Sequence, residues 1–159
     1  MRLPSQPVLN DELTAALGKS VIKLEVIPVR EGETLRVTFQ STASTWRQGL
    51  WLGVNGDLEI DGVRGDQFEV WTDNAPPSFE AKVVRTEDGL LRLYNIWDSG
   101  RGRRRESQSA TSGMLKEVRN DGAILYRSSD IGVQPRFDKL VFRVESVGQP
   151  AGSAGGASH

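Results

Sequence analysis

The sequence predicts an all-β protein, a single antiparallel β-sandwich of the jelly-roll kind with one short N-terminal helix. Apolar and polar residues alternate along several short runs, which is typical of strands that bury one face. Turn-forming residues separate these runs at intervals of about 8 to 12 residues, and no run has the period of a helix long enough to connect parallel strands. The same pattern also suits a closed or partly open β-barrel, which stays as the alternative architecture.

The clearest half-buried strand covers residues 35–40, where apolar and polar side chains alternate. Three turn signals predict hairpins: Asn55-Gly56 lies inside the run 50–60, Asp88-Gly89 precedes the run 90–98, and Asn120-Asp121-Gly122 joins the runs 114–119 and 123–128. The other runs with strand character are 21–26, 68–71, 79–85, 114–119, 123–128 and 137–145.

A single short helix is predicted over residues 10–18. Asn10 can cap its first turn, Asp11 and Glu12 suit the positive end of the helix dipole, and Gly18 can close it. Two turns of helix are not stable alone in water, so we expect this segment to dock on the β-structure.

Composition divides the chain into three parts. Residues 1–9 carry two prolines and are expected to form an extended arm, and residues 10–147 are expected to form the β-sandwich domain. Residues 148–159 are rich in glycine, serine and alanine, which is typical of a flexible tail.

The run from Leu90 to Asp98 is unusual because both of its faces are apolar. On one face, the odd-numbered residues are apolar except for Asn95. On the other face, the residues from Leu90 to Ile96 with even numbers are apolar except for Arg92. A half-solvated strand has only one apolar face, so we expect the second face to be covered by the helix, a loop or another molecule.

The residue inventory lacks the commonest catalytic and metal-binding groups. The chain of 159 residues has no cysteine, and its one histidine is the last residue, His159. Thiol nucleophiles, Ser-His-Asp triads and the usual zinc sites therefore cannot form within the fold. We expect a protein that is not an enzyme and that holds no cofactor and no metal.

Charge and hydropathy give no general attraction to nucleic acid or to membranes. The formal net charge is −1, and attraction to polyanions requires a summed positive potential. The N-terminus lacks the apolar run of about 7 residues that a signal peptide needs, and no apolar run approaches the roughly 18 residues of a transmembrane helix. We expect a soluble, cytoplasmic protein without a membrane partner.

Arginines are concentrated in the longest predicted loop, residues 99–112. Guanidinium groups bind phosphate and carboxylate with bidentate geometry, and a loop of this length is usually functional or disordered. The loop could therefore contact an anion, a nucleic acid or an acidic partner, and the simpler alternative is a solvated loop. The anion-binding or partner-binding candidates are Arg101, Arg103, Arg104 and Arg105.

Tryptophans near loops and strand ends suggest a lectin-like site. Sugar sites need an aromatic face for the apolar side of the ring and carboxylate or amide groups for its hydroxyls. The ligand-binding candidates are Trp46, Trp71, Asp73, Asn74, Tyr94, Trp97 and Asp98. The alternative is that Trp71 and Trp97 belong to the core.

Taken together, these observations predict a non-catalytic binding module. The first hypothesis is a protein-interaction or assembly domain with a protein partner or a second copy of the chain, using an exposed sheet face or edge. A lectin-like carbohydrate-binding module is the second. A contact with nucleic acid or phosphate through residues 101–105 is the third, although the net charge argues against nucleic acid as a general partner.

Overall fold

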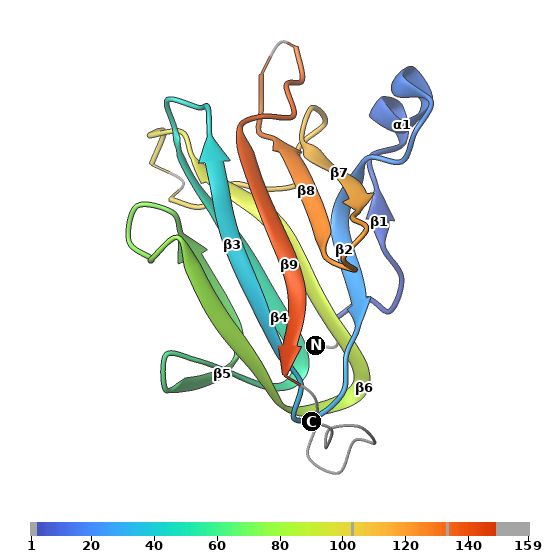
Figure 1. Cartoon of the computed structure of the whole chain (residues 1–159). Helices are drawn as coiled ribbons and strands as arrows, with labels where there is room; N and C mark the ends of the chain where they lie inside the picture. Colours follow the sequence, from blue (N-terminus) through green and yellow to red (C-terminus); the bar gives the residue numbers. More distant parts are fainter. Residues whose placement is uncertain (1–2, 103, 133, 149–159) are drawn as a thin grey trace.

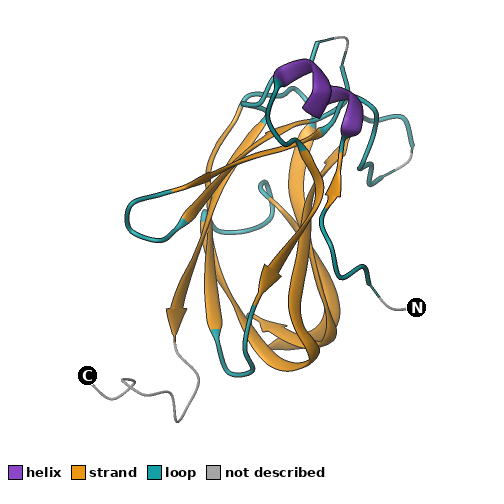
Figure 2. Ribbon diagram, turned by 90° about the vertical axis from the view of Figure 1, so that its right-hand side faces the viewer, coloured by secondary structure: helices purple, strands orange, loops and turns teal. Residues whose placement is uncertain are grey.

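The computed structural model describes residues 3–102, 104–132 and 134–148, and it confirms the all-β class with one short helix (Figures 1 and 2). Its elements are β1 (Val8–Leu9), α1 (Asp11–Leu17), β2 (Ile22–Pro28), β3 (Thr34–Thr42), β4 (Arg47–Ile60), β5 (Val63–Trp71), β6 (Ser78–Asp98), β7 (Gly113–Val118), β8 (Ile124–Ser129) and β9 (Leu140–Gly148).

Six strands close into a barrel, in the order β2, β7, β8, β9, β3 and β6, with β6 pairing again with β2. All of these pairings are antiparallel. The strand β1 adds to β2, while β4 and β5 continue the sheet from β6 (Figure 1). The structure therefore has the closed barrel that the sequence allows as the alternative to a sandwich.

Closure depends on β6, which is 21 residues long. Its first part pairs with β3 and its second part with β2, while β4 follows it over most of its length. The sequence predicts two strands here, joined by a hairpin at Asp88-Gly89, and that prediction is wrong. A single bent strand takes their place and joins both sides of the barrel.

The predicted hairpin at Asn120-Asp121-Gly122 is confirmed and joins β7 to β8, but the other two predicted turns lie side by side as bends in β4 and β6. The register of the β4–β6 pair shifts around Gly56, and the Asn55 side chain donates to Asp88 at 3.0 Å. A Cβ on Gly56 would lie 2.0 Å from the carbonyl oxygen of Arg85, so only glycine permits this close approach. The Asn55-Gly56 hairpin prediction is also wrong, because the residues serve as a bulge and β4 continues to Ile60.

Branched and aromatic side chains fill the barrel, as the alternating pattern predicts. Leu50, Leu52 and Leu93 are fully buried, and the rings of Tyr126 and Phe142 stack with centroids 5.0 Å apart. Burial of this apolar surface is the main stabilising contribution to such a fold.

The N-terminal arm covers the second face of β6 around Arg92, and Trp51 stacks on Tyr94 of the same face. The guanidinium of Arg92 is completely buried and donates to the carbonyl oxygens of Pro4, at 2.7 Å, and Leu3, and to both carboxylate oxygens of Asp88. We call these groups, together with Asn55, the bend cluster. Leu3 thus packs against the core and β1 pairs with β2, while residues 4–9 are exposed.

The helix α1 begins and ends where its caps predict. The Asn10 side chain accepts from the N–H of Leu13 at 3.1 Å, and Gly18 adopts the left-handed conformation. Asn10 also donates to the carbonyl oxygens of Ala110 and Ser112, which ties the helix to the long loop after β6. In the part of the chain that the structure describes, no helix is long and apolar enough to cross a membrane. The predicted tail, beyond Gly148, lies outside the described residues.

Candidate ligand-binding site

Buried polar side chains gather at one end of the barrel, which we call the loop end. It is formed by the β3–β4, β6–β7 and β8–β9 loops and carries α1, at the top of Figure 1. Apart from Glu25 and Arg92, the buried polar residues of the described chain lie here: Asn10, Gln48, Asn95, Ser112, Ser128, Ser129 and Asp130. Burying polar groups costs free energy unless they are paired, so their concentration at one end requires an explanation.

Asp130 is the centre of this group. It follows β8 directly, and its Oδ2 accepts from Ser44 Oγ at 2.8 Å and from Gln48 Nε2 at 2.9 Å. Nearby, Asn95 Nδ2 donates to the carbonyl oxygen of Ser129 at 3.1 Å. We call these five residues the loop-end cluster. They come from loops and strands that are far apart in the sequence, and they replace an apolar plug at this end.

Several buried polar atoms here have no hydrogen-bond partner among the described residues. They are Gln48 Oε1, Trp97 Nε1, Ser128 Oγ, Asp130 Oδ1 and Asp138 Oδ1. An unpaired buried polar atom costs about 1–3 kcal/mol, and ordered water or polar ligand atoms are the usual partners at such positions. The loop end therefore has a hydrogen-bonding capacity that the protein itself does not use.

A polar hollow of about 310 Å³ opens beside this cluster. It is lined by Trp97, Arg101, Arg105, Glu106, Ser107 and Ser109, with Ile131. Trp97 belongs to both the hollow and the set of residues with unpaired atoms, and Ile131 follows Asp130. The hollow is thus the solvent-facing side of the loop end.

Glu106 is held rigidly in the hollow. Its backbone forms two hydrogen bonds with the backbone of Trp97, at 2.8 and 3.1 Å, and its carboxylate accepts from the Ser99 N–H, the Ser99 hydroxyl and Arg101. Burial acts to raise the pKa of Glu106, but these hydrogen bonds outweigh it and lower the pKa to about 2. Glu106 is therefore an ionised, fixed acceptor at neutral pH.

The arginines predicted to bind an anion are differently placed. Arg101 pairs with Glu106, and Arg105 pairs with Glu69 of β5 at 2.8 Å. Arg104 is exposed, with a positive φ of 63° and no ion pair to any described residue. Arg103 lies outside the described residues. Two of the arginines thus have acidic partners within the chain, and an anion-binding role for this loop stays a prediction.

The predicted aromatic candidates do not meet in one cleft. Trp97 is fully buried, and Tyr94 stacks on Trp51 with ring centroids 4.8 Å apart. Trp71 packs against the core, and the guanidinium of Arg47 lies 4.3 Å from its ring centroid. Each of these rings is thus in contact with other parts of the protein. Trp71 and Trp97 pack with the core, as the alternative interpretation expects.

The predicted polar candidates are also dispersed. Asp73 is exposed and accepts from Arg47 Nε with both carboxylate oxygens, at 2.8 and 2.9 Å. Asn74 is exposed and lines a separate hollow beside Val70. Asp98 accepts from the Gly100 N–H at 2.9 Å and shapes the start of the long loop.

Trp46 is partly exposed and directly precedes β4, but it is not among the residues that line the hollow. Arg47 pairs with Asp98 in the β4–β6 register, and continuing that register by one residue places Trp46 opposite Ser99. Ser99 in turn holds Glu106. Among the described residues, Trp46 has no ring stacking or cation–π partner.

Sequence reasoning did not identify Gln48, Glu106 or Asp130 as site residues. Asn95 had a detectable signal, because it breaks an apolar face of the run 90–98. The other three look like ordinary loop or strand-end residues. Only the folded barrel brings them together.

Comparisons with known proteins add little to this geometry. No protein-family model and no curated protein matches the chain. Among solved structures, the fold is similar to a lectin from Chromobacterium violaceum, solved in complex with α-methyl-fucoside, at a TM-score of 0.35 and 12% identity over 77% of this chain and 93% of the lectin. At this level of similarity, sugar binding is a property of that lectin and does not transfer to this chain.

Proposed function

We propose that this chain is a non-catalytic binding module whose loop end takes a small, hydroxyl-rich ligand such as a saccharide. The observation that supports this proposal is the polar hollow beside buried polar atoms that have no protein partner. Binding sites for small polar molecules combine a concave surface with a few fixed hydrogen-bonding groups. The expectation that the chain is not an enzyme stays a prediction.

The side chains in the hollow suit vicinal hydroxyls. Glu106 offers a fixed carboxylate that accepts hydrogen bonds, while Arg101 and Arg105 offer guanidinium donors. Hydrogen bonds to charged groups are stronger than neutral ones, and a planar guanidinium or carboxylate can contact two neighbouring hydroxyls at once. A saccharide ring presents such pairs of neighbouring hydroxyls.

Trp46 would supply the apolar contact of such a site. Trp46 is half-buried and directly precedes β4, and the C–H face of a sugar ring packs against indole. Of the tryptophans predicted to bind a ligand, Trp46 is the one whose ring has no stacking or cation–π partner in the described chain and is not buried.

A broad glycan screen with the full chain tests the proposal, followed by titration of the best ligand while tryptophan fluorescence is recorded. We expect Trp46→Ala to weaken binding by at least about tenfold, taking as a guide the roughly 1–3 kcal/mol that an aromatic side chain contributes when a nucleic-acid base stacks on it. Trp46→Phe keeps an aromatic face and should retain most of the affinity.

Trp71→Phe serves as the matched control, because Arg47 already occupies its ring. Its affinity should stay within about twofold of the parent, and near-ultraviolet circular dichroism checks that each variant folds. A screen without any ligand, or a ligand that Trp71→Phe weakens and Trp46→Ala does not, would contradict the proposal.

A further inference from the structure

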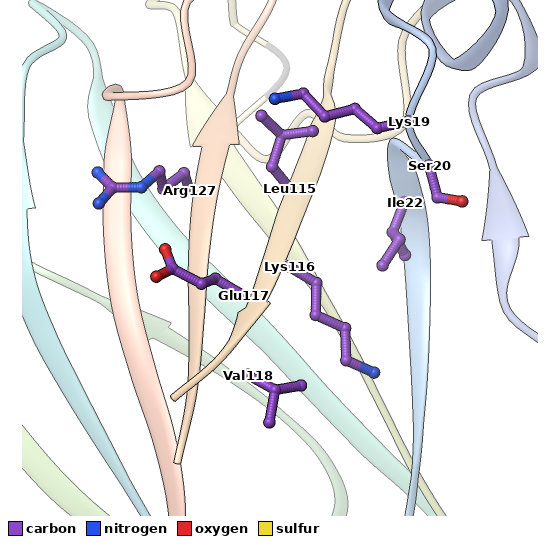
Figure 3. A pocket seen from close by; sticks show the side chains of 8 residues that line it. All are labelled: Lys19, Ser20, Ile22, Leu115, Lys116, Glu117, Val118 and Arg127. Carbon is purple, nitrogen blue, oxygen red and sulfur yellow. The ribbon is translucent and has the colours of Figure 1, made fainter. Parts of the chain in front are cut away.

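The barrel is weakly closed at the seam between β2 and β7. A single residue pair, Ile22 with Met114, joins these two strands, whereas β7 and β8 pair along their whole length. From Glu25 onward, β2 pairs with β6 instead. A groove of about 530 Å³ lies along this seam (Figure 3). We call it the seam groove. Its main lining residues are Lys19, Ile22, Leu115, Lys116, Val118 and Arg127.

Beyond Met114, the outer edge of β7 has no strand partner among the described residues. The Arg119 N–H donates to the Ala123 carbonyl on the β8 side at 2.8 Å. Because backbone groups alternate in direction along an antiparallel strand, the N–H and C=O groups of Lys116 and Val118 point away from β8. They form an open edge to which another extended segment can add.

The seam groove carries uncompensated positive charge. Lys116 is bound by the buried carboxylate of Glu25 at 3.1 Å, and Glu117 is bound by Arg119 at 2.6 Å. Lys19 and Arg127 have no ion pair within the described part of the chain. Figure 3 shows Arg127 to one side of Leu115 and the Lys19 side chain extending across above Leu115. The groove thus has two free cationic side chains next to an apolar centre.

Apolar side chains complete the groove. Val118 is 67% exposed, the most exposed large hydrophobic residue of the described chain, and Leu115 is half-buried. An exposed apolar side chain next to an unpaired strand edge favours association with an extended partner.

We propose that the seam groove binds an extended acidic segment of a partner protein, which adds as a short strand to β7. The open backbone groups of Lys116 and Val118 would provide the main-chain hydrogen bonds. Apolar side chains of the segment would contact Leu115 on one face of β7 and Val118 on the other, and its acidic side chains would pair with Lys19 and Arg127. This is the strand-addition mode of peptide recognition, in which main-chain bonds give affinity and side-chain contacts give specificity.

Charge argues against a second copy of the chain as the occupant. Symmetric pairing of two β7 edges would bring two positively charged grooves together, and like charges facing each other across an interface are unfavourable. The site also lies on strands other than those that form the polar hollow, so it is independent of the proposed saccharide binding.

Selection from a phage-displayed library of random twelve-residue peptides tests this inference with the full chain. We expect enrichment of peptides that alternate acidic and apolar residues. A synthetic copy of the best peptide, labelled with fluorescein, then reports affinity by fluorescence anisotropy. The double variant Lys19→Glu and Arg127→Glu should weaken binding by at least about tenfold, because it reverses both free charges.

Lys82→Glu is the matched charge control, since Lys82 is an exposed lysine on β6 away from the groove. It should change the affinity by less than about twofold. Val118→Pro removes a backbone N–H that points away from β8, at an edge position where a strand tolerates proline, and it should also weaken binding. Val118→Ala keeps this N–H and should weaken binding less.

Three results would overturn the inference. One is a selection that enriches no acidic peptide. Another is a selected peptide whose affinity is unchanged in both the charge-reversal double variant and Val118→Pro. The third is tighter binding of a twelve-nucleotide DNA than of the selected peptide, which would show that the positively charged groove is a nucleic-acid site.

Discussion

The bend cluster and the loop-end cluster are both buried and polar, but they differ in how completely their groups are paired. In the bend cluster, Arg92 is surrounded by acceptors: the carbonyls of Leu3, Pro4 and Leu90 and the carboxylate of Asp88. At the loop end, Asp130, Gln48 and Trp97 each keep an atom without a partner among the described residues. A fully paired cluster stabilises the fold, whereas an incompletely paired one beside a hollow is suited to binding.

Removing Arg92 should have the largest effect on stability. Arg92→Ala leaves the arm carbonyls and Asp88 without their donor, and we expect the free energy of unfolding to fall by about 3–5 kcal/mol. Urea unfolding measures this loss. Arg36→Ala breaks only the exposed pair with Glu80 and should cost less than about 1 kcal/mol. Equal losses in the two variants would show that the bend cluster has no special structural role.

The close approach of the two bent strands should be the next most sensitive feature. In Gly56→Ala, the added Cβ meets the backbone of Arg85, so we expect a loss of about 2–3 kcal/mol. Gly62→Ala is the control: its φ of 78° also disfavours a side chain, but no atom lies within 4 Å, and the cost should be about 1 kcal/mol. Equal losses would mean that the bend tolerates a wider strand separation.

Acid should weaken the bend cluster in a defined pH range. Hydrogen bonds from Arg92 outweigh burial and, with Asn55, lower the pKa of Asp88 from its ordinary 3.8 to about 2. Because the pKa is lower in the folded protein, the ionised form adds stability above pH 4, and this contribution is lost as the pH falls from 4 to 2.

Unfolding free energies measured between pH 7 and pH 2 check this expectation. Asp88→Asn should remove part of the decrease in unfolding free energy below pH 4. Glu106→Gln should remove a further part, since the pKa of Glu106 is also lowered to about 2. An unchanged decline in Asp88→Asn would indicate that its ion pair with Arg92 does not form in solution.

The smallest expected change in stability comes from removing a single serine hydroxyl at the loop end, where one hydroxyl has hydrogen-bond partners and its neighbour has none among the described residues. Ser128 Oγ is buried without a described partner, so Ser128→Ala should raise the free energy of unfolding by about 1 kcal/mol. Its neighbour Ser129 donates to the Asp130 carbonyl and accepts from the Arg136 N–H, so Ser129→Ala should lower it by a similar amount. Thermal unfolding of both variants tests the sign, and a loss in Ser128→Ala would mean that its hydroxyl is paired in solution.

Local patterns in the sequence predicted the helix and most of the runs that form strands, but they divided β4 and β6 into two strands each. Alternation identified the buried faces, and the Asn10 and Gly18 caps correctly bounded α1. The same local signals failed at Asn55-Gly56 and Asp88-Gly89, because glycine and asparagine suit a bulge as well as a hairpin turn. Whether such residues bend or reverse a strand depends on what lies across the sheet.

The candidate site was less predictable because it is built from distant parts of the chain. Asp130 is bound by Gln48 and Ser44, which are 82 and 86 residues away in sequence. Asn95 could be noticed only as an exception on an apolar face. Trp71 and Trp97 drew attention as aromatic residues at strand ends, yet packing occupies both rings.

The central claim is that the loop end binds a ligand, and the indole N–H signals of the four tryptophans test it most directly. In a ¹⁵N-labelled sample, each of them gives a separate signal that can be followed while the best glycan from the screen is added. We expect the signals of Trp46 and Trp97 to shift with saturation, while those of Trp51 and Trp71 stay in place. Shifts confined to Trp51 and Trp71, or no shift at a concentration that saturates binding, would contradict the claim.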